Sequence, residues 1–173
     1  MRVIAFSCVH WMTRKTQVEV YGYDEPLDYG PFIHLCDLII SSQPDVVVNL
    51  GDFTEDFWED KNDIPKLPNA YTLIQIGWRG NFYKITGNHD RYGEQFIELD
   101  GVRYEHGHKL GIPGNFESQD LYVEALRENV RGAKIVHGHT HIPSEAWPLD
   151  VGSVTFSHTY GEIIDGVPLL KKL

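Results

Sequence analysis

Short apolar runs that each lead into a cluster of glycine, histidine, aspartate or asparagine are the most constraining feature of this sequence. Residues 45–50 form a β-branched run that opens directly onto Gly51-Asp52. Residues 3–7, 82–86 and 134–136 have similar apolar character and are also followed by polar clusters. Because short apolar runs of this kind are typical of buried strands, the pattern predicts a sheet whose strands end in polar loops.

Helical periodicity lies between these predicted strands. Residues 31–42, 70–78 and 118–130 are expected to be helices, and Asp100-Gly101 predicts a hairpin turn between two short strands. Residues 11–29 are expected to form a loop or small insertion, 53–68 an irregular helical or loop segment, and the stretch after residue 146 successive short antiparallel strands. Alternating strands and helices indicate the α/β class, and we expect one domain over residues 1–173.

The polar clusters are expected to meet in space, because loops beyond the carboxyl ends of strands in open α/β sheets converge on one crevice. Their side chains offer one thiol, one carboxylate, one amide and five imidazoles. The set is Cys8, His10, Asp52, Asn88, His89, His106, His139 and His141. Such donors suit first-row divalent ions, and they outnumber the ligands of a single tetrahedral zinc. The sequence therefore predicts a site for two divalent metal ions, with manganese, zinc, iron or nickel as the candidates.

The charge balance limits what this chain could bind. Lys and Arg total 15 against 25 Asp and Glu, a formal charge of −10, which disfavours a long nucleic acid or an anionic membrane as partner. Two cysteines make no disulfide framework, and neither a signal peptide nor a membrane span is evident. We therefore expect a cytoplasmic protein; self-association into a homo-oligomer stays open.

The motifs together resemble those of the calcineurin-like metallophosphoesterase superfamily in its small single-domain form. The resemblance rests on Cys8-x-His10, Gly51-Asp52, Gly87-Asn88-His89-Asp90, His106-Gly107-His108 and Gly138-His139-Thr140-His141. It extends through Val151-Gly152-Ser153, and it implies an α/β/β/α four-layer sandwich with two mixed β-sheets packed face to face.

The resemblance also implies a role for each residue. One metal would be held by Cys8, His10, Asp52 and His141, and a second by Asp52, Asn88, His106 and His139. His89 would be the general acid or transition-state stabiliser, supported by Asp90.

Cys8 departs from the family pattern, in which the first motif reads Asp-x-His. A ligating thiolate favours zinc or iron over manganese or magnesium. Alternatively, Cys8 does not ligate and leaves the first site weak, or its thiol is redox-sensitive. We expect ligation to be retained, so the identity of the metals stays open.

The expected activity is hydrolysis of a small, nucleotide-like phosphodiester by attack of a metal-bridging hydroxide. Trp11, Arg91 and His108 are candidate substrate contacts, and the aromatic-rich insertion at 11–29 could form a base-stacking lip or simply close over its own core. The alternatives are a phosphomonoesterase of the same fold and a non-catalytic metal-binding interaction module, similar to the retromer subunit with this fold.

Overall fold

Two mixed β-sheets form the centre of the protein. The computed structural model describes residues 1–55, 66–76, 79–110 and 118–173. The first sheet has the strand order β3-β2-β1-β8-β9 and contains β1 (Arg2–Phe6), β2 (Val46–Asn49), β3 (Asn81–Lys84), β8 (Thr159–Ile164) and β9 (Val167–Lys172). Strands β1, β2 and β3 run parallel, whereas β8 and β9 are antiparallel to their neighbours. The carboxyl ends of β1, β2 and β3 therefore lie at one edge of the sheet.

The second sheet has the order β4-β5-β6-β7, with β4 (Phe96–Leu99), β5 (Val102–Glu105), β6 (Ile135–His137) and β7 (Leu149–Asp150). Strands β4 and β5 form the expected hairpin, in which Asp100 and Gly101 both have positive φ. Strands β5, β6 and β7 are parallel. The carboxyl ends of β5 and β6 thus also meet at one edge.

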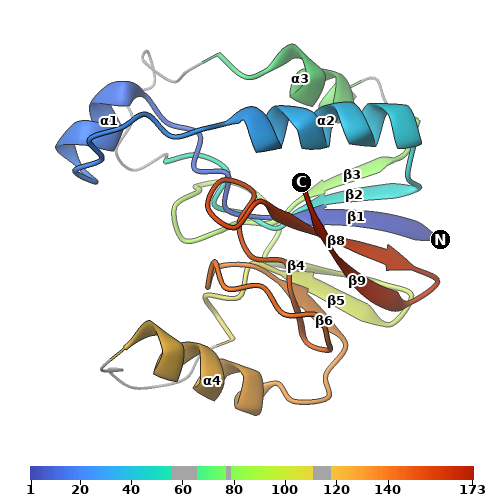
Figure 1. The fold of residues 1–173 in the computed structure, drawn as a ribbon. Coiled ribbons are helices and arrows are strands. Elements are labelled where there is room, and N and C mark those ends of the chain that lie inside the picture. Colours follow the sequence, from blue (N-terminus) through green and yellow to red (C-terminus); the bar gives the residue numbers. More distant parts are fainter. Residues whose placement is uncertain (56–65, 77–78, 111–117) are drawn as a thin grey trace.

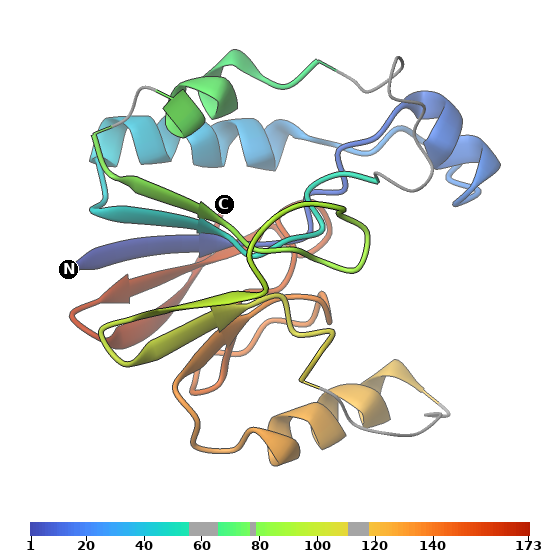
Figure 2. The same ribbon diagram turned by 180° about the vertical axis from the view of Figure 1, so that it is seen from behind.

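Helices cover the outer faces of the two sheets. Helices α2 (Gly30–Ser42) and α3 (Asn69–Ile76) lie over the first sheet, and α4 (Gln119–Asn129) lies on the outer side of the second (Figures 1 and 2). The two views agree on the order helices, sheet, sheet, helix. The predicted four-layer arrangement with two mixed sheets is therefore the observed one.

The side chains of β1 explain why both sheets stay buried. Ile4 and Phe6 belong to a core cluster shared with α2 and α3, whereas Val3 and Ala5 belong to a second cluster that includes Tyr104 of the other sheet. Successive residues of a strand point to opposite faces, so a strand buried on both sides must be apolar throughout. This is the physical origin of the continuous apolar runs in the sequence.

The structure corrects two expectations from the sequence. The 11–29 insertion contains a helix, α1 (Arg14–Glu19). Thr13 caps its N-terminus, because the Thr13 side chain accepts a hydrogen bond from the Thr16 amide. Strand β7 pairs with β6 in parallel, so the segment after residue 146 is not wholly antiparallel. Of the irregular segment expected at 53–68, residues 56–65 lie outside the described residues, as do residues 77–78 of the helix expected at 70–78.

None of the helices in the described part of the chain is long and apolar enough to cross a membrane. Cys8 and Cys36 are both buried and form no disulfide with each other.

Two buried tyrosines make a matched test of core energetics. The Tyr104 hydroxyl has no hydrogen-bond partner among the described residues, whereas the Tyr71 hydroxyl accepts a bond of 2.9 Å from Asn49 Nδ2. Because an unpartnered buried hydroxyl costs free energy, we expect Tyr104→Phe to keep or raise the free energy of unfolding, by up to ~1–2 kcal/mol. Tyr71→Phe should lower it by about 1 kcal/mol. Urea unfolding of both variants measures the difference, and equal losses would contradict the assignment.

Candidate metal centre

Strained backbone marks the loops that follow the strands. Nine non-glycine residues in the described segments have positive φ, and five of them belong to the predicted ligand set: Cys8, His10, Asp52, His139 and His141. Three of the other four sit at a helix end or in hairpin turns (Gln43, Asp100 and Asp165). Positive φ costs a non-glycine residue about 1–3 kcal/mol, and such residues concentrate where function over-determines the backbone.

Glycines allow these loops to pack closely. A Cβ on Gly87 would lie 2.0 Å from Asp52 Oδ1 and 2.3 Å from the Asp52 amide nitrogen, and a Cβ on Gly51 would lie 2.5 Å from the Gly87 amide nitrogen. The loops after β2 and β3 therefore touch backbone to backbone, which places the Asp52 carboxylate against the Asn88-His89 segment.

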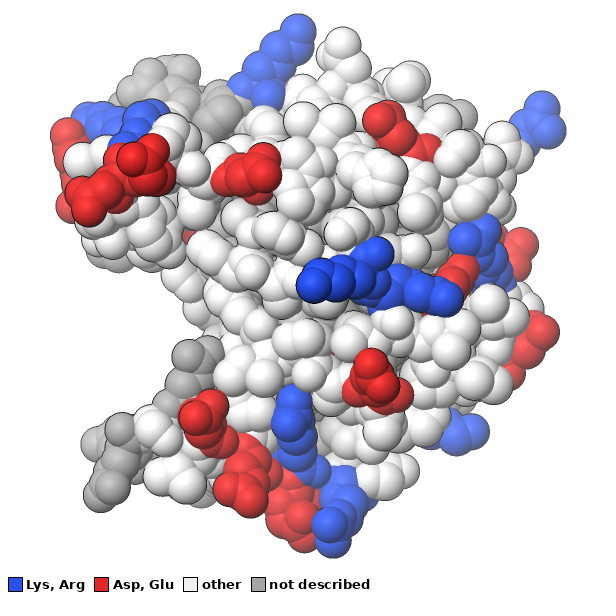
Figure 3. All heavy atoms as spheres, viewed as in Figure 1, with Lys and Arg blue, Asp and Glu red and all other residues white. Residues whose placement is uncertain are grey.

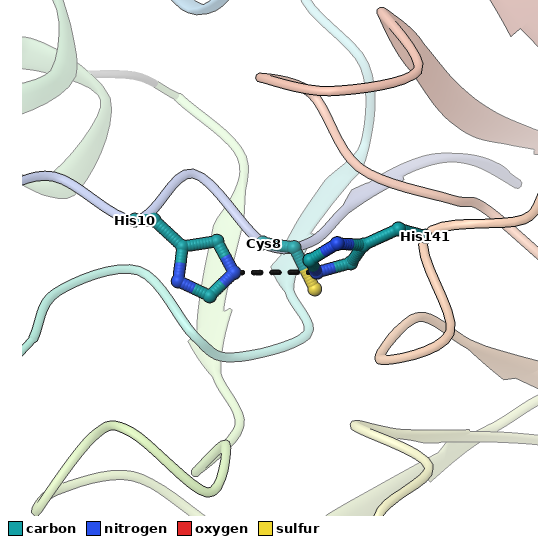
Figure 4. A group of neighbouring side chains, drawn as sticks. All are labelled: Cys8, His10 and His141. Carbon is teal, nitrogen blue, oxygen red and sulfur yellow. Dashed lines mark hydrogen bonds between the residues drawn. The ribbon is translucent and has the colours of Figure 1, made fainter. Parts of the chain in front are cut away.

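Cys8, His10 and His141 form the first group of potential ligands. Their ligand atoms all lie within 4.8 Å of one another, and the two histidine Nε2 atoms are 3.3 Å apart. Figure 4 shows the two rings pointing toward each other, with the Cys8 sulfur beside His141. The loops after β1 and β6 thus bring together residues that are 131 positions apart.

Asp52, Asn88 and His106 form a second group next to the first. His106 Nε2 lies 3.0 Å from Asp52 Oδ2 and 3.1 Å from Asn88 Oδ1, while its Nδ1 is 2.9 Å from the Leu50 carbonyl oxygen, to which it donates. In a neutral ring, the form that a metal ligand requires, that hydrogen bond leaves the lone pair on Nε2. Cys8 Sγ also lies within 4.8 Å of the Asp52 and His106 ligand atoms, so the thiol is shared by both groups.

His139 and His108 flank the second group. The ring of His139 lies 5.1 Å from that of His106, and the ring of His108 lies 5.3 Å from His106 and 6.2 Å from His139. The structure thus brings together the seven predicted metal ligands and His108.

The donor set fits divalent metal ions. Two donors bound to one ion at ~2.0–2.1 Å are ~2.9–3.4 Å apart at tetrahedral or octahedral angles, which matches the 3.0, 3.1 and 3.3 Å separations. Because His10 Nδ1 faces Glu55, a neutral His10 ring turns its Nε2 lone pair toward His141 Nε2, where either a cation or the His141 N–H can satisfy it. Imidazole, carboxylate, amide and thiolate donors are those of zinc, iron, manganese and nickel sites.

Glu55 is a functional residue that the sequence analysis missed. Its side chain is fully buried, with Oε1 2.5 Å from His10 Nδ1 and Oε2 2.7 Å from His89 Nδ1. Tyr21 Oη donates to the same Oε2 at 2.5 Å. Glu55 therefore joins a predicted metal ligand to the predicted general acid. Its position three residues after Asp52 was the available signal, but it lies at the edge of an acidic stretch in which no carboxylate stands out.

Asp90 and Trp11 both make contacts within the protein, and their proposed roles at the site stay predictions. Asp90 Oδ1 accepts hydrogen bonds from the Phe53 and Thr54 amides and Oδ2 from the Gly87 amide, so this carboxylate ties two loops together, and the direct partner of His89 is Glu55. The Trp11 ring packs 4.4 Å from Tyr29 and 6.1 Å from Phe32, against the core. Arg91 is exposed in the loop after Asp90, and its contact with substrate stays a prediction.

Residues 1–147 match the sequence profile of the calcineurin-like phosphoesterase family. The chain belongs to this family. No curated protein sequence matches the chain. Among solved structures, Vps29 from Chaetomium thermophilum has a TM-score of 0.51 at 15% identity, covering 95% of this chain and 82% of that chain. A single mutant of Vps29 from Entamoeba histolytica has a TM-score of 0.50 at 14% identity, covering 100% and 98%.

The E. coli phosphoesterase YfcE has a TM-score of 0.48 at 16% identity, covering 95% of this chain and 89% of that chain. At these identities the Vps29 structures are informative about the fold alone. The family assignment agrees with the resemblance found in the sequence motifs.

The carboxylates of the candidate site are held ionised. Burial alone would raise the pKa of Asp52, but the hydrogen bond and charge of His106, with the charge of His10, keep it well below its usual range. Burial likewise opposes ionisation of Glu55, yet hydrogen bonds from His10, His89 and Tyr21 lower its pKa to about 2. Both groups are therefore anionic near neutral pH and can stabilise cations.

The histidines separate into two classes. Burial and then the charge of neighbouring histidines lower the pKa of His139 to about 3 and that of His141 to about 4, so both are neutral donors. The hydrogen bond to Glu55 instead raises the pKa of His89. Burial and then the charge of Asp52 raise the pKa of the Cys8 thiol, so a thiolate there needs a compensating cation. Metal binding requires neutral imidazoles such as those of His139 and His141, whereas acid catalysis requires an imidazole that holds a proton, such as that of His89.

Replacing Glu55 tests its link between the two histidines. We expect Glu55→Gln to lower kcat of the phosphoesterase activity about tenfold to a hundredfold, because His89 and His10 lose the carboxylate that orients them. The matched control is Glu98→Gln, which removes an exposed carboxylate on β4 and should leave kcat unchanged. Steady-state kinetics with saturating metal make the comparison, and equal rates for both variants would remove Glu55 from the mechanism.

Proposed function

We propose that this chain hydrolyses a small, nucleotide-like phosphodiester with the help of two divalent metal ions. The observation that carries the proposal is the position of His89: its Nδ1 is bound to buried Glu55 and its amide donates to Asp52 Oδ1 at 2.9 Å. The His89 ring is thereby fixed by Glu55, and its backbone by Asp52, which is itself one of the potential metal ligands. A site made only to bind metal has no need of such an imidazole.

Each metal has its own proposed set of ligands. One ion would be held by Cys8, His10, Asp52 and His141, and the other by Asp52, Asn88, His106 and His139. The 3.0–3.3 Å separations between donors within each set support this division. Because Cys8 supplies sulfur and lies within reach of both groups, zinc or iron is proposed at the first site, while manganese, zinc, iron or nickel suits the second.

The chain's own residues would perform the remaining chemistry. When bound, two divalent ions would neutralise the phosphate oxygens and lower the pKa of a water molecule, and so supply a nucleophile at neutral pH. With Nδ1 of His89 directed at Glu55, its Nε2 is the atom left to give a proton to the leaving-group oxygen. Glu55 stabilises the protonated form of His89 that gives this proton, and it orients the ring. Asp90 keeps the loops after β2 and β3 in register.

The acidic surface supports a small substrate. Figure 3 shows the molecule hollowed between the α1 side and the α4 side, with carboxylates along both edges. Exposed acidic residues there include Asp24, Glu25 and Asp28 near α1, and Asp120, Glu124 and Glu128 on α4. A long polyanion would be repelled by these edges, whereas a small ester can reach the metals between them. A cytoplasmic location and self-association stay expectations from the sequence.

Hydrolysis of bis(p-nitrophenyl) phosphate by zinc- or manganese-loaded protein tests the proposal against its alternatives. We expect turnover that disappears when a chelator is added. It should also disappear in Asp52→Asn, because Asp52 is the ligand that both proposed sets share. Turnover of p-nitrophenyl phosphate with no turnover of the diester would show a phosphomonoesterase. Bound metal without hydrolysis of either ester would show a non-catalytic interaction module.

A further inference from the structure

An aromatic wall lies beside the metal centre, formed by Tyr21 and Tyr23 after α1 and by Phe156 in the turn before β8. We propose that Tyr23 and Phe156, backed by Tyr21, form a subsite on which a planar nucleobase of the substrate stacks. This inference rests on the proposed phosphodiesterase function and names the part of the substrate that the metals do not hold.

The aromatic wall is in direct contact with the proposed catalytic groups. Tyr21 Oη donates to Glu55 at 2.5 Å and is 3.4 Å from His89 Nδ1. The Phe156 ring stacks on His141 with centroids 5.0 Å apart and an interplanar angle of 22°, and lies 5.7 Å from His10. A phosphate bound between these histidines would therefore place its ester group against the wall.

A base would stack on the exposed face of these rings and would not insert between them. Tyr21 and Tyr23 stack at 5.7 Å and 12°, and Tyr23 and Phe156 are tilted by 54° with centroids 6.4 Å apart. A third ring between Tyr23 and Phe156 would need ~3.5 Å on each side, more than the spacing allows. Phe156 is 41% exposed beside this polar site. Stacking of a base on the open face would cover it.

Both halves of the aromatic wall are rigidly held. The Arg14 guanidinium donates to the carbonyl oxygens of Tyr23 at 3.0 Å and Glu25 at 3.1 Å, which fixes the backbone that presents Tyr23. In the other half, Ser153 Oγ donates to the Cys8 carbonyl oxygen at 2.7 Å and Thr155 Oγ1 to the Val9 carbonyl oxygen at 2.6 Å. The turn bearing Phe156 is thus attached to the metal-binding loop itself. Preorganised rings lose little conformational entropy on binding, so their contact area contributes to affinity.

The charge around the aromatic wall favours stacking as the source of affinity. The residues that follow Tyr23 are Asp24 and Glu25, both exposed, and Arg14 is already engaged with their backbone. No basic side chain is needed to hold a neutral base, whereas a polynucleotide would require several. The wall therefore fits a single nucleoside ester.

Three diesters with one leaving group isolate the subsite. The p-nitrophenyl phosphodiesters of thymidine (at its 5′ oxygen), methanol and choline differ only in the group that would meet the aromatic wall. We expect the thymidine ester to have the lowest KM in the wild type. Tyr23→Leu and Phe156→Leu should each raise that KM roughly fivefold to a hundredfold relative to the KM of the methyl ester in the same variant, and Tyr23→Trp should keep it low. Phe96→Leu is the matched control, because Phe96 is 43% exposed but lies over the Arg103 guanidinium on β4.

Equal KM values for the thymidine and methyl esters in the wild type would overturn the subsite while leaving the phosphodiesterase function in place. A Tyr23-dependent preference for the choline ester would also overturn it, by showing a cation site. The subsite can also be tested if the protein hydrolyses none of these esters, because binding is measurable without turnover. Calorimetry of metal-loaded protein should show thymidine 5′-monophosphate binding more tightly than inorganic phosphate. Tyr23→Leu should abolish that difference, and equal affinities in the wild type would contradict the inference.

Discussion

Replacing His89 with alanine is expected to lower kcat for phosphodiester hydrolysis about 100- to 10,000-fold, with the metal content unchanged. His89 holds its proton against Glu55, its backbone amide donates to Asp52, and its ring packs edge-on against the His10 ring with centroids 5.3 Å apart. Loss of a general acid has an effect of this size, while loss of a ring that binds no metal leaves the ions in place.

The leaving group distinguishes proton donation from a structural effect. An ester with a basic alkoxide leaving group needs the proton more than one with a p-nitrophenolate, so His89→Ala should slow the first more than the second. His34→Ala, an exposed histidine on α2, is the matched control and should keep full activity. Equal losses for both esters, or a loss of metal with the activity, would remove the assigned role.

Replacing Cys8 with serine is expected to remove the thiophilic character of the first metal site. In cobalt-substituted wild-type protein we expect a sulfur-to-cobalt charge-transfer absorption in the near ultraviolet, because Cys8 Sγ lies within 4.8 Å of the His10 and His141 ligand atoms. The band should be absent from Cys8→Ser and Cys8→Asp. Cys8→Asp should retain two metals, with its preference shifted from zinc toward manganese.

Cys36→Ala serves as the control, because Cys36 is buried in α2 among core residues and should not affect the spectrum. Wild-type protein that binds two cobalt ions without the charge-transfer band would show that Cys8 does not ligate. A band that survives in Cys8→Ser would likewise exclude Cys8 as the sulfur ligand.

Local patterns in the sequence predicted most of the fold. Residues 3–6 of β1 and 46–48 of β2 are all apolar because both faces of these strands are buried, and the β4–β5 hairpin follows from an Asp-Gly turn that accepts positive φ. The parallel pairing of β7 was not predictable in this way, since its partner β6 is specified by the tertiary fold and not by a turn. Helix α1 is short and flanked by aromatic residues that obscure its periodicity.

The candidate site was predictable where ligands follow strands directly, as Asp52 follows β2. Glu55 was not, because its importance comes from burial between His10 and His89, which lie in the loops after other strands. The packing of the Trp11 ring against Tyr29 was not predictable either, because adjacency to His10 in sequence says nothing about which side of the loop a ring faces. Contacts between loops are properties of the assembled sandwich.

The metal stoichiometry of the reconstituted protein tests the central claim most directly. Metal-free wild-type protein and Asp52→Asn are dialysed against excess zinc, freed of loosely bound ions and measured by elemental analysis. If one cluster holds two ions that share Asp52, the wild type should retain about two zinc ions per chain and Asp52→Asn fewer than one. A wild type that retains one ion or none, or an Asp52→Asn variant that retains two, would contradict the binuclear site.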